Sequence, residues 1–239
     1  KRKFFSKTIN SILNQSYKKF EIIIIYDDTD KEDLQFLKSF KSKKIKIIIN
    51  KKNLGVGKSR NKGIKITRTK YIAFCDADDV WQKDKLKKQI YYMEKFKAEF
   101  THTDYKIIND TDKTIGKMRI KKDMIYSELL RSCDVGLSTV IIKTKILKKN
   151  LFCNLKTKED YALWLKLSRK GIKISGINIS LSSWRKNQFS LSSNSKQKIF
   201  DAFRLYYFYE KFNLINSIYL TLRLSIFYLI KRFVQKKDL

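Results

Sequence analysis

Residues 71–81 read Tyr-Ile-Ala-Phe-Cys-Asp-Ala-Asp-Asp-Val-Trp, an apolar run that ends in three acidic side chains. A run with no alternating polar face is typical of a strand covered on both sides in a mostly parallel sheet. Ligands collect at the carboxyl ends of such strands, where Asp76, Asp78 and Asp79 stand. Clustered carboxylates repel one another, and Mg²⁺ or Mn²⁺ would compensate their charge and in turn hold a diphosphate. The alternative is a polar turn that caps the following helix.

The composition is that of a globular chain with a large excess of positive charge. Of 239 residues, 43% are hydrophobic and 32% are charged, against a usual charged share of about 25%. The formal net charge of +31 favours polyanionic partners, whether nucleic acid, anionic lipid or phosphorylated substrates. Because the lysines are spread through every segment, a nucleic-acid partner is not favoured. The length suits one large α/β domain with an appendage.

Cysteine and histidine offer few candidates for chemistry. Cys75, Cys133 and Cys153 are widely spaced and odd in number, which predicts neither a disulfide framework nor a zinc motif. His102 is the only histidine, so a histidine-based metal site or catalytic triad is not expected. The acidic residues therefore remain the candidates. Position 1 is Lys instead of Met, and we expect the chain to begin inside a longer protein.

The hydrophobic pattern predicts helices and strands that alternate as far as residue 75, which argues for a parallel sheet with helices on its faces. Helices are expected at residues 4–15, 31–40, 58–66, 84–96, 124–132, 159–170, 196–212 and 214–234. Strands are expected at residues 21–26, 44–50, 71–75, 100–109, 113–119, 138–142 and 172–183. The expected division is one domain over residues 1–195 and a C-terminal helical segment over residues 196–239.

Four groups of motifs follow one another in an order that is specific as a set. Residues 11–28 join a helix to an acidic strand end, and residues 53–63 hold the turn Asn-Leu-Gly and the helix Ser-Arg-Asn-Lys-Gly. The acidic strand of residues 71–81 follows, and Glu-Asp-Tyr-x-Leu-Trp at residues 159–164 completes the set. Over residues 6–195 this order resembles the family 2 glycosyltransferases. These are inverting enzymes with a GT-A fold, a Rossmann-like and mostly parallel sheet flanked by helices, that transfer sugars from nucleotide diphosphates.

The resemblance implies donor-binding roles for several acids and one arginine. Asp78 would ligate the Mg²⁺ or Mn²⁺ ion that bridges the two phosphates, and Asp76 would hold the ribose or the water shell of the metal. Asp27 or Asp28 would receive the base and its ribose, with a solvated strand-end turn as the alternative. Arg60 would face the nucleotide, because a guanidinium matches phosphate, with a surface salt bridge as the alternative.

The resemblance also implies roles on the acceptor side. Asp160 corresponds to the general base that removes the proton of the acceptor hydroxyl. Glu159 corresponds to a cap or supporting residue, and Trp164 is either a wall of the acceptor subsite or part of the core. Arg185, with the serines at 190 and 192, resembles a loop that closes near the diphosphate.

The reaction implied is transfer of a sugar from a nucleotide diphosphate donor, a uridine diphosphate sugar being favoured, to a hydroxyl of a glycan or lipid-linked acceptor. It would serve bacterial cell-surface polysaccharide or lipopolysaccharide synthesis. The chain would be cytoplasmic and peripheral on the cytoplasmic face of the inner membrane.

Two features depart from the family pattern. Nothing before Phe4 supplies the first strand, and the turn after Asp28 is short. These departures indicate either a fragment of a longer protein or an enzyme that has lost part of its pocket for the base. The alternatives are a catalytically inactive GT-A module that binds nucleotide sugars, and a nucleotidyltransferase.

Residues 214–234 combine a broad apolar face with a narrow polar one. The polar face is Ser217, Thr221, Ser225, Arg232 and Gln235, and the apolar face is Ile215, Ile218, Tyr219, Leu222, Ile226, Leu229, Ile230 and Phe233. Such a helix fits the interface of an anionic membrane. Arg223 near its middle argues against a transmembrane span. The alternative is a helix packed on the domain.

Overall fold

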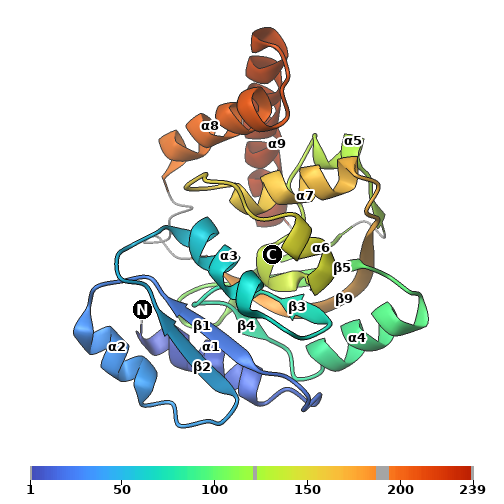
Figure 1. The fold of residues 1–239 in the computed structure, drawn as a ribbon. Helices are drawn as coiled ribbons and strands as arrows, with labels where there is room; N and C mark the ends of the chain where they lie inside the picture. The colour runs from blue at the N-terminus through green and yellow to red at the C-terminus, as the bar shows by residue number, and fades with distance from the viewer. Residues whose placement is uncertain (1, 121–122, 187–193, 238–239) are drawn as a thin grey trace.

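The computed structural model describes residues 2–120, 123–186 and 194–237, with side chains as far as residue 228 (Figure 1). The helices are α1 (Arg2–Leu13), α2 (Lys31–Lys38), α3 (Val56–Ile66), α4 (Lys85–Lys95), α5 (Tyr126–Leu129), α6 (Thr144–Lys149), α7 (Glu159–Arg169), α8 (Ser195–Arg204) and α9 (Leu214–Lys237), with single turns η1 (Leu137–Thr139) and η3 (Leu205–Tyr209). The strands are β1 (Ile22–Tyr26), β2 (Ile45–Ile49), β3 (Tyr71–Ala73), β4 (Val80–Trp81), β5 (Phe100–Ile108), β6 (Thr114–Met118), β7 (Asp123–Met124), β8 (Ile141–Lys143) and β9 (Ile174–Arg185).

The strands form two sheets. β1 and β2 make a parallel pair, and a larger sheet has the order β3-β8-β5-β9-β4, with β6 added to β5 and β7 to β9. The predicted α/β class with flanking helices is confirmed. The expectation of a mostly parallel sheet needs correction, because β8 runs antiparallel to both β3 and β5, and β6 returns along β5 as a hairpin. In the larger sheet, as far as the chain is described, the parallel pairing is that of β5 with β9.

The core lies on both faces of the larger sheet. Successive residues of a strand point to opposite faces, and β8 shows the consequence. Ile141 packs with Ile9, Trp81 and neighbours from α1 and α4, whereas Ile142 packs with Trp164 and the other apolar residues of α7. The strand is therefore covered on both sides, as an apolar run predicts.

The long predicted elements are confirmed, and the differences concern short ones. The strand expected at residues 138–142 is a single turn, η1, followed by β8. The strands β4 and β7 and the helix α6 have two, two and six residues, and they were not predicted. Segments this short repeat the hydrophobic period too few times to be recognised, and the two short strands form by pairing with β9.

Helix α9 packs on the domain through the side that carries its small hydroxyl residues, and not through its broad apolar side. Leu220 and Leu224 of α9 join the core cluster of α7, and Ser217 and Thr221 beside them are buried. The apolar side that includes Leu222 is exposed instead. From residue 229 onward the expected faces lie outside the described side chains. Among the described residues, no helix combines the length and the apolar character that crossing a bilayer requires.

Candidate active site

The acidic loop between β3 and β4 carries three carboxylates in different surroundings. The side chain of Asp76 is 40% exposed, Asp78 is half-buried and Asp79 is buried. The turn η1 fixes the loop, because the Asp76 amide donates to the hydroxyl of Ser138 in that turn at 3.0 Å. Trp81, just after the loop, donates its indole N–H to the Ser138 carbonyl at 2.9 Å.

Asp79 is the structural acid of the loop. Its carboxylate accepts a hydrogen bond from the Arg185 amide at 2.9 Å, and burial and the neighbouring Asp76 raise its pKa well above the usual range. The Arg185 side chain is fully buried and donates to the Asp78 carbonyl at 2.9 Å and to the Asn109 carbonyl at 2.6 Å. Arg185 therefore supports the acidic loop from the end of β9. The serines expected to act with it lie outside the described residues.

Asp78 has a carboxylate with few protein partners. Among the described residues, the hydrogen bond that it accepts comes from its own backbone amide. Burial, followed by the charge of Asp76, raises its pKa, although Arg185 opposes the shift. Two adjacent carboxylates whose charges repel are the donor set that a hard divalent cation relieves. Asp76 and Asp78 thus fit Mg²⁺ or Mn²⁺ chemically, while no group of three or more His, Cys, Asp or Glu side chains in the described part of the chain is arranged to hold a metal ion.

Asp27, at the end of β1, organises the turn that precedes α3. Its carboxylate accepts hydrogen bonds from the Asn50 side chain and from the amides of Leu54 and Gly55, each at 2.8 Å. Gly55 has a φ of +84°, a conformation that glycine adopts without strain. These bonds use three of about four acceptor positions on the carboxylate, so one remains for a ligand. Asp28, the next residue, is exposed.

Arg60 joins the acidic loop to α7. It lies one turn into α3, and its guanidinium pairs with Asp76 at 2.8 Å and with Glu159 on the other side. The arginine side chain is only 16% exposed and packs over the Phe152 ring at 5.6 Å. Burial alone would lower the pKa of Arg60, but Asp76 and Glu159 raise it above its ordinary value. Arg60 is therefore a buried bridge between two motifs, and not a surface salt bridge.

The first turn of α7 presents Glu159 and Asp160 to this bridge. Burial and the charge of Asp160 raise the pKa of Glu159 to about 7, against the opposing effect of Arg60. Burial also raises the pKa of Asp160, and Arg60 again opposes the shift. One Asp160 oxygen accepts the Tyr161 amide at 2.7 Å. Since Arg60 contacts Asp76 and Glu159 together, the structure brings Asp160 and the acidic loop into one site.

Trp164 lies in the core behind the site. It is fully buried, its ring centroid is 4.8 Å from that of Phe100, and its indole N–H donates to the Val135 carbonyl at 3.2 Å. Trp164 was expected either in the core or in the wall of the acceptor subsite, and it lies in the core. Its role is to hold α7 against the sheet.

Comparisons with known proteins give the family. The model of Glycosyl transferase family 2 matches residues 1–155. The chain is 35% identical over 193 residues to the UDP-Glc:alpha-D-GlcNAc-diphosphoundecaprenol beta-1,3-glucosyltransferase WfaP of Escherichia coli. The match covers 80% of this chain and 76% of that protein. The chain belongs to glycosyltransferase family 2. The alternative of a nucleotidyltransferase and that of an inactive binding module lose their support.

Solved structures show that this glycosyltransferase has the fold of known enzymes. TarS of S. aureus, residues 1–349 in complex with UDP-GlcNAc, has a TM-score of 0.67 at 19% identity and covers 92% of this chain and 67% of that chain. The mannosyltransferase PcManGT of Pyrobaculum calidifontis, in complex with GDP-Man and Mn²⁺, has a TM-score of 0.61 at 11% identity, with 86% and 59% covered. The predicted GT-A fold is confirmed.

Several residues that build the glycosyltransferase site were missed from the sequence. Asn61 holds α3 to the segment before α7, because its side chain accepts from the Phe152 amide and donates to the Phe152 carbonyl, both at 2.9 Å. A Cβ on Gly57 would lie 2.7 Å from the Cys153 carbonyl, so only glycine allows this approach. Ser138 and Asn109 also went unnoticed. The order Arg-Asn-x-Gly was a signal for Asn61, whereas Ser138 and Asn109 stand in weakly patterned segments.

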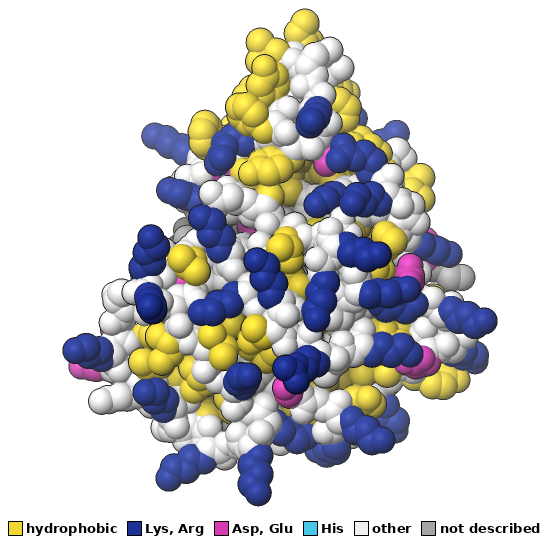
Figure 2. All heavy atoms as spheres, in the orientation of Figure 1, with side chains coloured by type: hydrophobic (Ala, Val, Ile, Leu, Met, Phe, Trp, Pro, Cys, Tyr) yellow, Lys and Arg dark blue, Asp and Glu magenta, His cyan; other side chains and the backbone are white. Residues whose placement is uncertain are grey.

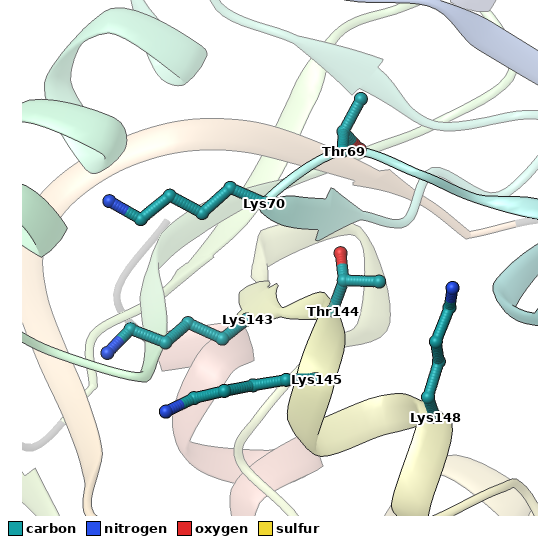
Figure 3. A pocket seen from close by; sticks show the side chains of 6 residues that line it. All are labelled: Thr69, Lys70, Lys143, Thr144, Lys145 and Lys148. Atoms are coloured by element: carbon teal, nitrogen blue, oxygen red, sulfur yellow. The ribbon is translucent and has the colours of Figure 1, made fainter.

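A basic hollow lies elsewhere on the glycosyltransferase. It has a volume of about 450 Å³ and lies at the start of β3, opposite the acidic end. Its lining is Thr69, Lys70, Lys143, Thr144, Lys145 and Lys148. Three of the lysines extend in one direction (Figure 3) and pair with acids, Lys70 with Glu94 and the other two with Glu99. The hollow is therefore separate from the candidate active site.

Proposed function

We propose that the chain is an inverting glycosyltransferase that moves a sugar from a nucleotide diphosphate donor to a hydroxyl of a lipid-linked glycan. The observation that carries this proposal is the bridge of Arg60 between Asp76 and Glu159. The bridge supports a site in which the donor-side carboxylates lie at one end of the Arg60 guanidinium and the candidate base, Asp160, follows Glu159 at the other end. In-line attack on the anomeric carbon needs this arrangement, because the base and the departing diphosphate act on opposite faces of the sugar.

Each donor-side residue has a role that its surroundings support. Asp78 and Asp76 would hold Mg²⁺ or Mn²⁺, and Mg²⁺ sites commonly use one or two carboxylates together with substrate phosphates. When bound, the cation would neutralise charge on the leaving diphosphate. Asp27 has one free acceptor position for the base or ribose, and Asp28 is exposed beside it. A uridine diphosphate sugar is the favoured donor, because both the WfaP name and the TarS complex name one.

Asp160 would act as the general base. Its carboxylate must be ionised to accept the proton of the acceptor hydroxyl, and Arg60 favours the ionised form against the effect of burial. Glu159, bonded to Arg60, would position the arginine and the start of α7.

The name of a relative supports a class of acceptor. WfaP is named for a diphosphoundecaprenol acceptor, an isoprenoid lipid that carries the sugar through a diphosphate. We assign this chain an acceptor of the same class, used at the cytoplasmic face of the inner membrane in cell-surface polysaccharide synthesis. We place the catalytic domain in residues 1–195 and the membrane-facing segment in residues 196–239.

A donor panel tests the proposal. The purified protein would be incubated with Mn²⁺, a short-chain lipid diphosphate sugar and one nucleotide sugar at a time, and released nucleoside diphosphate would be measured. We expect release with a uridine diphosphate sugar, loss of release in Asp160→Asn, and an inverted anomeric configuration in the product by NMR. Acceptor-independent release equal to that with acceptor, or a retained configuration, would overturn the proposal.

A further inference from the structure

The C-terminal helices expose many large apolar side chains. Figure 2 shows hydrophobic side chains gathered at the end of the molecule where Figure 1 places α8 and α9. We name this surface the apolar platform. It consists of Ile199, Phe200, Tyr207, Phe208, Leu214, Ile215, Ile218, Tyr219, Leu222, Ile226, Phe227 and Tyr228, which are 38% to 78% exposed. Apolar patches of this extent mark interaction surfaces on soluble domains.

The arrangement of α9 shows that the exposure follows from packing. Its buried side contains Ser217 and Thr221, whose hydroxyls are satisfied within the helix at 2.8 Å and 2.7 Å. The same side contains Leu220 and Leu224, which reach the core. A helix that buries hydroxyls and exposes a broader apolar side is oriented opposite to the usual surface helix. The platform is therefore turned outward while the helix is held firmly.

The charges of the segment fit an anionic lipid surface. Within residues 194–228 the acidic residues are Asp201 and Glu210, and both are buried. The exposed charge of this segment is therefore basic. Cations also lie against platform rings: Lys198 over Tyr228 at 5.0 Å, Arg204 near Phe200 at 5.6 Å and Arg223 near Tyr219 at 5.4 Å. Tyrosine rings and basic side chains with apolar stems are suited to the boundary between headgroups and acyl chains.

The two buried acids attach this segment to the catalytic domain. Asp201 accepts from the Thr157 amide at 2.8 Å and from its hydroxyl at 3.0 Å. Thr157 comes just before Glu159 and Asp160, so α8 is fixed to the start of α7. Glu210 accepts from the Tyr126 hydroxyl at 2.6 Å and from Arg169, near the end of α7, at 3.1 Å. The platform is thus held by both ends of the helix that presents the candidate base.

We propose that the apolar platform inserts into the headgroup region of an anionic bilayer and presents the candidate active site to lipid-linked acceptors. The part concerning the acceptor rests on the proposed function. The lipid tail of an acceptor would remain in the membrane, and its diphosphate-linked sugar would reach Asp160 from the α8 side. Binding to anionic vesicles does not depend on the reaction and can be tested separately.

Flotation with vesicles tests the docking. The vesicles would contain equal parts of phosphatidylglycerol and phosphatidylcholine, with pure phosphatidylcholine for comparison. We expect the intact chain to float with the anionic vesicles and the double variant Ile218→Glu, Leu222→Glu to lose about tenfold or more of its binding, since charges would face the acyl boundary. The matched control, called the α4 control, is Tyr91→Glu on α4 with Phe96→Glu directly after it, which makes the same charge change at positions that are at least as exposed. It should float like the unmodified chain.

Two outcomes would overturn the docking proposal. One is equal flotation of the platform variant and the α4 control. The other is a stable dimer in sedimentation that the platform variant dissociates, without vesicle binding by the unmodified chain, because the platform would then bind a second copy. Thermal unfolding of both variants would show that they are folded.

Turnover separates this proposal from the proposed function. With a short-chain, water-soluble acceptor, both double variants should turn over like the unmodified chain. With a long-chain acceptor in vesicles, only the platform variant should lose activity. Absence of turnover by the unmodified chain with every acceptor would count against the proposed function, while vesicle flotation would still decide the docking.

Discussion

The strand ends of β1 and β3 both carry acidic residues, yet their carboxylates are used differently. At β1, Asp27 accepts three hydrogen bonds from the turn before α3. At β3, Asp78 has few protein partners within the described residues, and burial raises its pKa. A carboxylate whose acceptor positions are mostly filled by protein donors stabilises a fold, whereas a half-buried one with few protein donors is more available to a cation or ligand. The comparison assigns structure mainly to the β1 end and chemistry to the β3 side.

Among the residues assigned to the chemistry, Asp160→Asn should have the largest effect on turnover. The substitution removes the base and leaves the donor site intact, and general bases contribute about 10²- to 10⁴-fold to rate, so turnover should fall by that factor. Donor affinity by calorimetry should not change. Undiminished turnover would show that Asp160 is not the general base.

Arg60→Met should be the most destabilising change. It leaves Glu159 buried without its partner, and breaking a buried pair typically costs about 3–5 kcal/mol. The free energy of unfolding from urea titration measures the effect. Lys70→Met is the matched control, because its pair with Glu94 is largely exposed and screened by solvent, so its loss should change stability far less. Equal effects of the two substitutions would show that the bridge of Arg60 between Asp76 and Glu159 does not stabilise the fold.

Asp78→Asn should weaken the donor site without unfolding the protein. Loss of a charged ligand typically costs about 1.5–3 kcal/mol, so donor affinity in the presence of Mn²⁺ should fall about 10- to 100-fold. Excess Mn²⁺ should restore part of the activity, and the melting temperature should hardly change. Glu32→Gln, an exposed acid on α2, is the control for the charge change. Normal donor affinity with unchanged metal dependence would contradict the assignment.

Asp27→Asn should lower the stability of the fold more than the affinity for the donor, the reverse of Asp78→Asn. The Leu54 and Gly55 amides donate to different oxygens of Asp27, so an Asn side chain leaves one of them without its acceptor, and an unsatisfied donor of this kind costs about 1–3 kcal/mol of stability. Donor affinity should fall less than in Asp78→Asn. Asp28→Asn, at the exposed neighbour, should change stability by less than about 0.5 kcal/mol. If Asp28→Asn proved as destabilising as Asp27→Asn, the β1 end would have no special structural role.

The sequence allowed the long elements and the principal acids to be predicted. The apolar run before Asp76 and the helix that begins at Glu159 have clear patterns, and the structure contains both. The hydrogen bonds of Asp27 could not be predicted, because two of its donors are backbone amides whose direction depends on the turn at Gly55. The sequence also presented Arg60 as a phosphate ligand, since its partner Glu159 is far away along the chain.

The orientation of α9 on the domain could not be predicted from the sequence either. The helical period separates an apolar side from a polar side but does not determine which side meets the domain. Leu220 and Leu224 reach the core of α7, and this contact buries Ser217 and Thr221 with them. Which side of α9 meets the domain therefore depends on contacts that are distant in sequence.

The separation of β1 and β2 from the larger sheet has a consequence for hydrogen exchange. A two-stranded sheet is only marginally stable alone, so this pair depends on α3 and on the bonds to Asp27. Local opening of such a unit is expected at lower free energy than global unfolding. Amides of β1 and β2 should then exchange faster than those of β5, and a bound nucleotide should slow them. Part of the donor's binding energy would go into holding this unit closed, and truncated donors would show weaker protection there.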